Sequence, residues 1–256
     1  MSSQSPSNLP SCAPRGRVRW WWIVVGSGLL FLASLLVLLL LARHEPAFYA
    51  TNRDGAAVGA DADAVEAVRQ RGAGRFLSKV AALAADVGRP GEWSTVIAED
   101  ELNAWLAGDL PANHPEILPA GVEDLRVHFG SGVVLLGCRL GGPLAGLAWA
   151  EVRLRLLEAN RLAMTVEQCR MGLLPLPAGV ASSQLADGLK RAGLRCEMLR
   201  IAGQTELVAQ LPAAEIEGNG GVAVSWWLDG LRIEEGEVFL TGSSRQVDSG
   251  RRASAF

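Results

Sequence analysis

Near the start of the chain, apolar residues form one long uncharged run over residues 20–42, WWWIVVGSGLLFLASLLVLLLLA. At about 1.5 Å of rise per residue, a helix of this length measures about 35 Å, which is enough to cross a hydrocarbon core of about 30 Å. Arg15, Arg17 and Arg19 precede the run, and the positive-inside bias then places the N-terminus in the cytoplasm. We therefore expect an uncleaved signal-anchor: one transmembrane helix in the cytoplasmic (inner) membrane, with the rest of the chain extracytoplasmic.

Three alternatives to an uncleaved anchor are open. A cleaved signal peptide has a shorter apolar core of about 7–15 residues and a small-x-small site. Here that site would be Leu40/Ala42 or Phe48/Ala50, and neither pair fits well. A lipoprotein needs a cysteine after the run, whereas Cys12 precedes it. A buried core helix rarely continues this far without a polar residue.

Two later segments place apolar residues three or four positions apart, which predicts amphipathic helices. The first covers residues 61–87, although Gly72 and Gly74 weaken its middle. The second covers residues 178–192 and ends at Gly193.

A third, shorter helix is expected from Glu99, because acidic residues favour a helix N-terminus. Its apolar face includes Trp105, and it ends at Gly108 and Pro111. Residues 111–121 contain three prolines and are predicted to form a loop.

From residue 122 the spacing of apolar positions changes to two, which is typical of strands with one polar face. Four such strands follow at meander spacing, and their apolar positions are Leu125–Phe129, Val134–Leu140, Val152–Leu156 and Leu162–Val166. Further strands are expected over residues 194–201, 205–211, 222–228 and 231–240. The pattern predicts an antiparallel meander sheet packed on one or two helices, and therefore the α+β class.

These elements divide the chain into five parts. They are a disordered cytoplasmic tail (1–19), the transmembrane helix (20–42), a linker (43–60), the extracytoplasmic α+β domain (61–242) and a disordered tail (243–256).

Composition and net charge exclude some classes of protein and of partner. Of the 256 residues, 49% are hydrophobic and 20% are charged, which excludes a disordered or collagen-like chain. The formal net charge is −3, and the first 42 residues carry three arginines and no acid, so the remainder is more acidic still. An acidic outer domain gives no electrostatic reason to expect nucleic acid as a partner.

No catalytic, metal or cofactor residue is assigned. His44, His114 and His128 are the three histidines, and no two of them have metal-ligand spacing. Glu99–Glu101 is the densest acidic run before a helix, but acids in a first helical turn are expected from the helix dipole alone.

Three cysteines, Cys138, Cys169 and Cys196, follow the anchor. An odd number permits at most one disulfide between them. Cys169 and Cys196 flank the same predicted helix and are a possible pair. Three free thiols are the favoured interpretation.

The apolar side of the predicted sheet and its covering helices is the candidate binding face. We assign to it Trp105, Leu154, Leu156, Leu185, Leu189 and Trp227. These residues are either an ordinary core or the wall of a pocket for an apolar ligand. Trp226 and Trp227 are adjacent, so in a strand they point to opposite faces and one of them is a candidate for exposure.

Three stretches, IAEDELNAWLAGDLP, PEILPAGVEDLRVHF and CRMGLLPLP, follow a shared pattern of helix, proline-rich loop, meander and step into a covering helix. Over residues 93–193 the chain resembles the YpmS-like family of uncharacterised membrane-anchored bacterial proteins and its planctomycete-type relatives. Ala98 departs from the pattern, which has a hydroxyl residue there. The resemblance implies a single anchor and an extracytoplasmic α+β domain. Some similar folds belong to lipid-binding tubular proteins, and no catalytic residues carry over.

Together these features predict a membrane-anchored, extracytoplasmic, non-enzymatic domain that binds lipid or another apolar component of the cell envelope. The alternative is a scaffold or assembly subunit of an envelope protein complex, which would bind protein through an edge strand or a patch around Trp227. A third possibility is a hydrolase that uses Glu99–Glu101.

Overall fold

The computed structural model describes residues 44–49, 62–118, 121–141, 146–201, 204–212, 216–217 and 223–247, together with Ser34 and Leu41. The helices are α3 (Ala62–Val87), α4 (Glu99–Ala107), α5 (Asp109–Asn113), the 3-10 helix η1 (Pro115–Ile117) and α6 (Ala178–Arg191). The strands are β1 (Gly91–Ala98), β2 (Val122–Gly130), β3 (Val133–Leu140), β4 (Gly146–Glu158), β5 (Arg161–Met171), β6 (Leu174–Pro175), β7 (Arg195–Ile201), β8 (Gln204–Gln210), β9 (Ile216–Glu217), β10 (Ala223–Glu234) and β11 (Glu237–Gln246).

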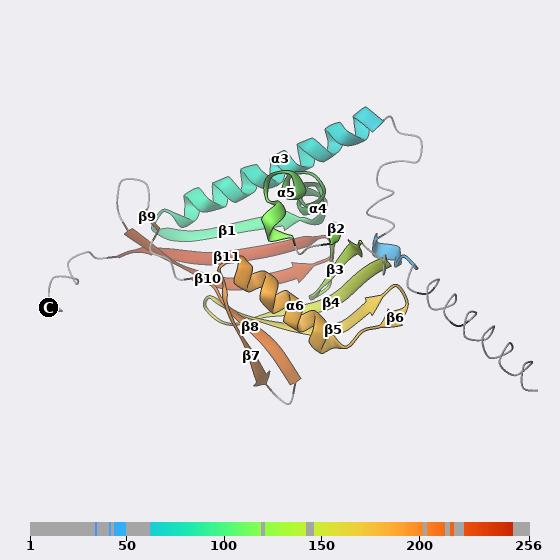
Figure 1. Ribbon diagram of the computed structural model, residues 1–256. Helices are drawn as coiled ribbons and strands as arrows, with labels where there is room; N and C mark the ends of the chain where they lie inside the picture. Colours follow the sequence, from blue (N-terminus) through green and yellow to red (C-terminus); the bar gives the residue numbers. More distant parts are fainter. Residues whose placement is uncertain are drawn as a thin grey trace, which may run out of the picture. The chain divides into compact units, whose positions relative to one another are not determined.

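The chain folds into two antiparallel sheets with helices packed against them, which confirms the α+β class (Figure 1). One sheet has four strands in the order β1-β11-β10-β9. The other has seven strands in the order β2-β3-β4-β5-β8-β7, and the short β6 pairs with β5. The predicted meander is β2 to β5, in which each strand pairs with the next along the chain.

Helix α3 packs along α4 and β1 (Figure 1). Its Gly72 lies against α4, where an added Cβ would come within 2.7 Å of the Cβ of Ala104. This glycine therefore allows the two helices to approach closely, which accounts for a residue that weakens the helix in isolation. A Cβ at Gly74 would meet nothing within 4 Å.

Three apolar clusters fill the space between helices and sheets. The first joins α4 and α5 to β2, β3, β10 and β11, and includes Leu106, Phe129 and Ile233. The second joins α6 to β4, β5, β7 and β8. The third joins α3 and β1 to β10 through Val87, Trp93 and Leu228. Every helix longer than one turn in the described residues thus contributes to a core.

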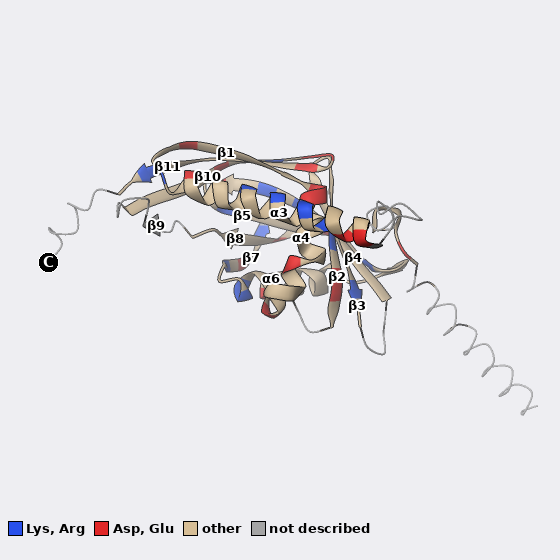
Figure 2. Ribbon diagram, turned by 90° about the horizontal axis from the view of Figure 1, so that it is seen from above, with Lys and Arg blue, Asp and Glu red and all other residues tan. Residues whose placement is uncertain are grey.

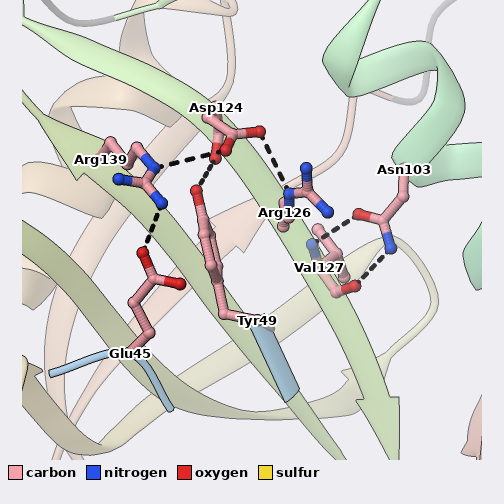
Figure 3. Close-up of polar contacts among 7 residues, drawn as sticks. All are labelled: Glu45, Tyr49, Asn103, Asp124, Arg126, Val127 and Arg139. Atoms are coloured by element: carbon pink, nitrogen blue, oxygen red, sulfur yellow. Dashed lines mark hydrogen bonds and ion pairs between the residues drawn. The ribbon is translucent and has the colours of Figure 1, made fainter. Parts of the chain in front are cut away.

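Two asparagine side chains close the edges of strands. The side-chain amide of Asn103 in α4 donates to the carbonyl of Val127 at 2.7 Å and accepts from its N–H at 2.8 Å (Figure 3). This is the pair of bonds that a neighbouring strand would supply to the edge of β2.

Asn160, in the turn between β4 and β5, does the same for β10. Its side chain donates to the carbonyl of Trp226 at 3.0 Å and accepts from the N–H of Leu228 at 2.6 Å. It is 1% exposed and has a positive φ of 63°, a conformation that asparagine tolerates well. This residue joins the seven-stranded sheet to the four-stranded sheet.

The structure corrects several predicted elements. The single expected sheet is two sheets, and β1 was not predicted. The two strands expected over residues 222–228 and 231–240 are present as β10 and β11, but the boundary between them lies at residues 235–236. Strand β10 runs through Gly230 with a bulge between Leu228 and Gly230, and the chain turns at Gly236, which has a positive φ of 77°. A Cβ at Gly230 would collide with the Thr241 hydroxyl, so glycine is needed there for close strand approach.

Two further boundaries differ from expectation. Residues 109–113, partly assigned to a loop, form α5; Pro111 is its third residue, where no intrahelical N–H bond is lost. Strand β11 extends to Gln246, past Gly242, after which the sequence predicted a tail.

The predicted transmembrane segment 20–42 lies outside the described residues, apart from Ser34 and Leu41, which are helical. Among the helices that the structure describes, none combines the length and the apolar character needed to cross a bilayer.

We expect Asn160→Gly to destabilise the domain by about 2–4 kcal/mol, because two buried backbone groups of β10 lose their partners. Glycine keeps the positive φ, so this variant isolates the amide, and Asn160→Ala should cost about 1 kcal/mol more. Urea unfolding of residues 44–247, followed by tryptophan fluorescence, measures both. Asn113→Ala is the control, because this exposed side-chain amide bonds Asp109 within the same short helix and the change should be below about 0.5 kcal/mol. An Asn160→Gly variant as stable as that control would contradict the assignment.

Candidate functional site

Residues 44–49, immediately after the predicted membrane span, are built into the fold of the domain that follows. They end in a helical turn at residues 47–49, and Tyr49 is 0% exposed. We call residues 44–49 the docked segment. It lies on the polar side of β2, β3 and β4, opposite the apolar clusters, and is the most specific polar arrangement in the described part of the chain.

Tyr49 occupies a socket formed by β2 and β3. Its ring lies against the backbone of Gly137, where an added Cβ would be 2.8 Å from the ring. Its hydroxyl donates to the main-chain carbonyl of Asp124 at 2.7 Å. The guanidinium groups of Arg126 and Arg139 lie 5.3 and 5.9 Å from the ring centroid, within cation–π range.

Asp124 organises the charges around this socket. It has a positive φ of 49° and lies at an irregularity between Glu123 and Arg126 in the pairing of β2 with β3. Its carboxylate pairs with Arg126 at 3.1 Å and with Arg139 at 3.6 Å, and Arg139 also pairs with Glu45 of the docked segment (Figure 3).

The socket shifts the pKa values of the Tyr49 hydroxyl and the Asp124 carboxyl in opposite directions. Burial, followed by the neighbouring Asp124, raises the pKa of Tyr49 well above its ordinary value, and the two arginines do not offset this. Burial alone would raise the pKa of Asp124, but the Tyr49 hydroxyl and the Arg126 guanidinium outweigh it and hold that pKa below its usual value. The socket therefore favours a neutral tyrosine beside an ionised aspartate.

Phe48 extends the contact to β4. Its ring stacks on His128 at 6.1 Å and meets Trp149 edge-on, also at 6.1 Å between centroids. The indole N–H of Trp149 donates to the carbonyl of Gly172 at 3.1 Å, and Arg170 lies over the same ring. The docked segment is thus fixed to three strands by aromatic, ionic and hydrogen-bonding contacts.

The sequence assigned these residues to the linker 43–60. They have no strand or helix periodicity, and their partners lie about 75 to 94 residues later. The available signal was the aromatic pair Phe48–Tyr49 beside the charged Glu45, which is unusual for a flexible linker.

The six residues assigned to an apolar binding face do not converge on one site. Trp105 and Leu154 pack against the first cluster, Leu154, Leu185 and Leu189 against the second, and Leu156 against the third. Trp105 also contacts Phe76 and donates to Asp109 at 2.8 Å. These five side chains are therefore used in packing helices onto the sheets.

Trp227 differs from the other five. Its neighbour Trp226 packs against the third cluster, whereas Arg245 lies over the Trp227 ring at 5.5 Å. The same sheet carries an open depression of about 470 Å³, lined by Glu92, Trp93, Ser94, Asp229, Thr241, Gly242, Ser243 and Arg245. Arg245 thus links Trp227 to a polar depression rather than to an apolar pocket.

The acidic run Glu99–Glu101 makes structural contacts. Glu99 accepts from the backbone N–H of Phe129 at 2.8 Å and bonds the His128 ring. Glu101 is buried and pairs with Lys79 at 2.6 Å and Arg75 at 3.3 Å, which ties α4 to α3. Within the described ranges, no cluster of His, Cys, Asp and Glu is able to hold a metal ion.

Cys138, Cys169 and Cys196 are free thiols, each partly buried. Burial, with a smaller contribution from Cys169, raises the pKa of Cys138 to about 11. This thiol is therefore protonated at neutral pH and a poor nucleophile.

No protein-family model, curated protein or solved structure matches the chain.

We expect Tyr49→Ala to lower the free energy of unfolding by about 3–5 kcal/mol, because a fully buried ring is removed. Tyr49→Phe should cost about 1–2 kcal/mol, since it leaves the Asp124 carbonyl without its donor. Urea unfolding of residues 44–247 measures both, with Val68→Ala on the exposed surface of α3 as the control. A fragment of residues 56–247 should be as unstable as Tyr49→Ala. Equal free energies of unfolding for residues 44–247 and residues 56–247 would show that the docked segment does not stabilise the domain.

Tyr49 is the single tyrosine of the chain, so tyrosinate absorbance reports on it alone. Its pKa is raised in the folded state, so the neutral form stabilises the fold; this contribution is complete below the unfolded pKa of about 10 and is lost as pH rises through the folded pKa. In an alkaline titration, the absorbance should appear well above pH 10 in the native protein, and near pH 10 in denaturant. Titration of the native protein near pH 10 would contradict the burial of Tyr49.

Proposed function

We propose that the protein is a membrane-anchored, extracytoplasmic, non-enzymatic binding domain of the cell envelope. Residues 20–42 are the proposed anchor, with the N-terminus in the cytoplasm. The supporting observation is the docked segment, because it ties the outer domain to the chain directly after that span. A domain on a loose tether would have no need of a buried tyrosine at this position.

The proposed ligand is lipid or another apolar envelope component, and the proposed binding surface is one flank of α3. Five of the six apolar positions expected to bind it are used in packing, so an apolar ligand needs side chains that reach solvent. Leu77 and Val80 do so, being 43% and 42% exposed, and Ala81 and Ala84 continue the same flank at helical spacing. Lys79 is the sole charged residue between Phe76 and Ala85. Figure 2 marks the Lys and Arg residues of α3 in blue and its Asp and Glu residues in red.

The non-enzymatic part of the proposal rests on how the best catalytic candidates are used. Glu99 caps the edge of β2, and Glu101 ties α4 to α3. Both carboxylates therefore have structural roles that account for their presence.

One observation favours the alternative, a scaffold that binds protein. The polar depression, with Trp227 and Arg245 beside it, offers an aromatic and charged surface of the kind enriched at protein interfaces. The resemblance to the YpmS-like family agrees with either version and remains a prediction.

We test the proposed surface by placing a photoreactive phenylalanine analogue at Leu77 of the full chain in living cells. Lipid in contact with the α3 flank should give an adduct of lipid mass after irradiation. The matched control places the analogue at Ser78, an exposed position about 100° around the helix axis from Leu77. A protein adduct at Leu77 would favour the scaffold, and equal labelling at both positions would contradict binding by this flank.

A further inference from the structure

The docked segment limits how far the domain can lie from the membrane. This limit rests on the proposed anchor at residues 20–42. The docked segment begins at residue 44, and an extended chain spans at most about 3.6 Å per residue. The start of the docked segment therefore lies within about 10 Å of the end of the span, and Tyr49, seven residues after residue 42, lies within about 25 Å of it.

A continuous set of contacts leads from the docked segment to the turn between β5 and β6. Phe48 meets the ring of Trp149, whose indole donates to the carbonyl of Gly172. The N–H of Gly172 donates to the carbonyl of Leu147 at 2.7 Å. The turn is thus fixed to β4 beside the docked segment, at the same end of the seven-stranded sheet (Figure 1).

This end of the domain exposes large apolar side chains. Leu173, in the turn, is 44% exposed, and Val180, in the first turn of α6, is 53% exposed. Arg170 lies over the ring of Trp149, whose indole bonds Gly172, the residue before Leu173. Aliphatic side chains with a tryptophan and an arginine are the combination favoured at the boundary between lipid headgroups and acyl chains.

We propose that Leu173 and Val180 insert into the surface of the same membrane that holds the anchor, as a second point of contact. An anchor alone leaves a domain free to rotate about one covalent connection. Two contacts, linked through Tyr49, Phe48 and Trp149, fix which face of the domain points away from the bilayer.

The test uses the full chain in vesicles of phosphatidylcholine and phosphatidylglycerol, with the four native cysteines replaced by alanine. A nitroxide is attached at Leu173→Cys, and its accessibility to a water-soluble nickel chelate and to membrane-soluble oxygen is measured. The matched control is Met198→Cys, since Met198 is 46% exposed but lies in β7, at the far edge of the sheet order. The nitroxide at residue 173 should be severalfold less accessible to nickel and more accessible to oxygen than the control.

Flotation of the vesicles separates the two proposals. Protein that does not float with lipid overturns the anchor itself. Protein that floats but has equal nickel accessibility at residues 173 and 198 overturns the second contact and leaves the anchor standing. Adding Tyr49→Ala to Leu173→Cys should raise nickel accessibility toward the control value while the protein still floats. The comparison of residues 173 and 198 does not depend on that variant.

Discussion

Strand β2 is the element on which the remaining structure depends. Its inner face, its free edge and its outer face each contact a different part of the chain. Its inner side chains, Val127 and Phe129, enter the first apolar cluster. Its free edge is closed by Asn103 and Glu99 of α4, which bond backbone groups that would otherwise need another strand. Its outer side holds Tyr49.

This arrangement couples the docked segment to the domain core. The bonds to the edge of β2 set the position of α4, and Glu101 of α4 sets the position of α3. The irregularity in the same strand presents Asp124 and Arg126 to the docked segment. A force applied at residues 44–49 therefore acts on β2, and through it on both sheets. In the proposed function, these contacts fix the orientation of the domain relative to the anchor, whereas a flexible linker would leave the domain free to rotate.

The spacing of apolar residues along the sequence predicted those helices and strands that bury one face over many residues. The meander from β2 to β5, helix α3 and helix α6 were recoverable because burial of one face imposes a period of two or 3.6 over many residues. The turn at Gly132 and the helix end at Gly193 also follow from sequence, because glycine readily adopts the positive φ that both positions have in the structure.

The remaining features depend on contacts between distant segments. In the sequence, Asn160 is an ordinary turn residue. Its side chain bonds the backbone of β10, more than sixty residues later, and no local pattern indicates this contact. Gly230 reads as a strand end but is a site of close approach to Thr241. Sequence does not distinguish the wall of a pocket from a packed core, and five of the six residues assigned to the apolar binding face belong to packed clusters.

Tyr49 holds the segment that follows the proposed anchor in the domain, and a single fluorine nucleus on this residue reports whether it does. Biosynthetic 3-fluorotyrosine labels only residue 49, because the chain has one tyrosine. In the full chain in lipid nanodiscs, we expect one resonance, shifted from the value of free fluorotyrosine and insensitive to a water-soluble paramagnetic agent. A resonance at the free value that the agent broadens fully would contradict the docking and the function built on it.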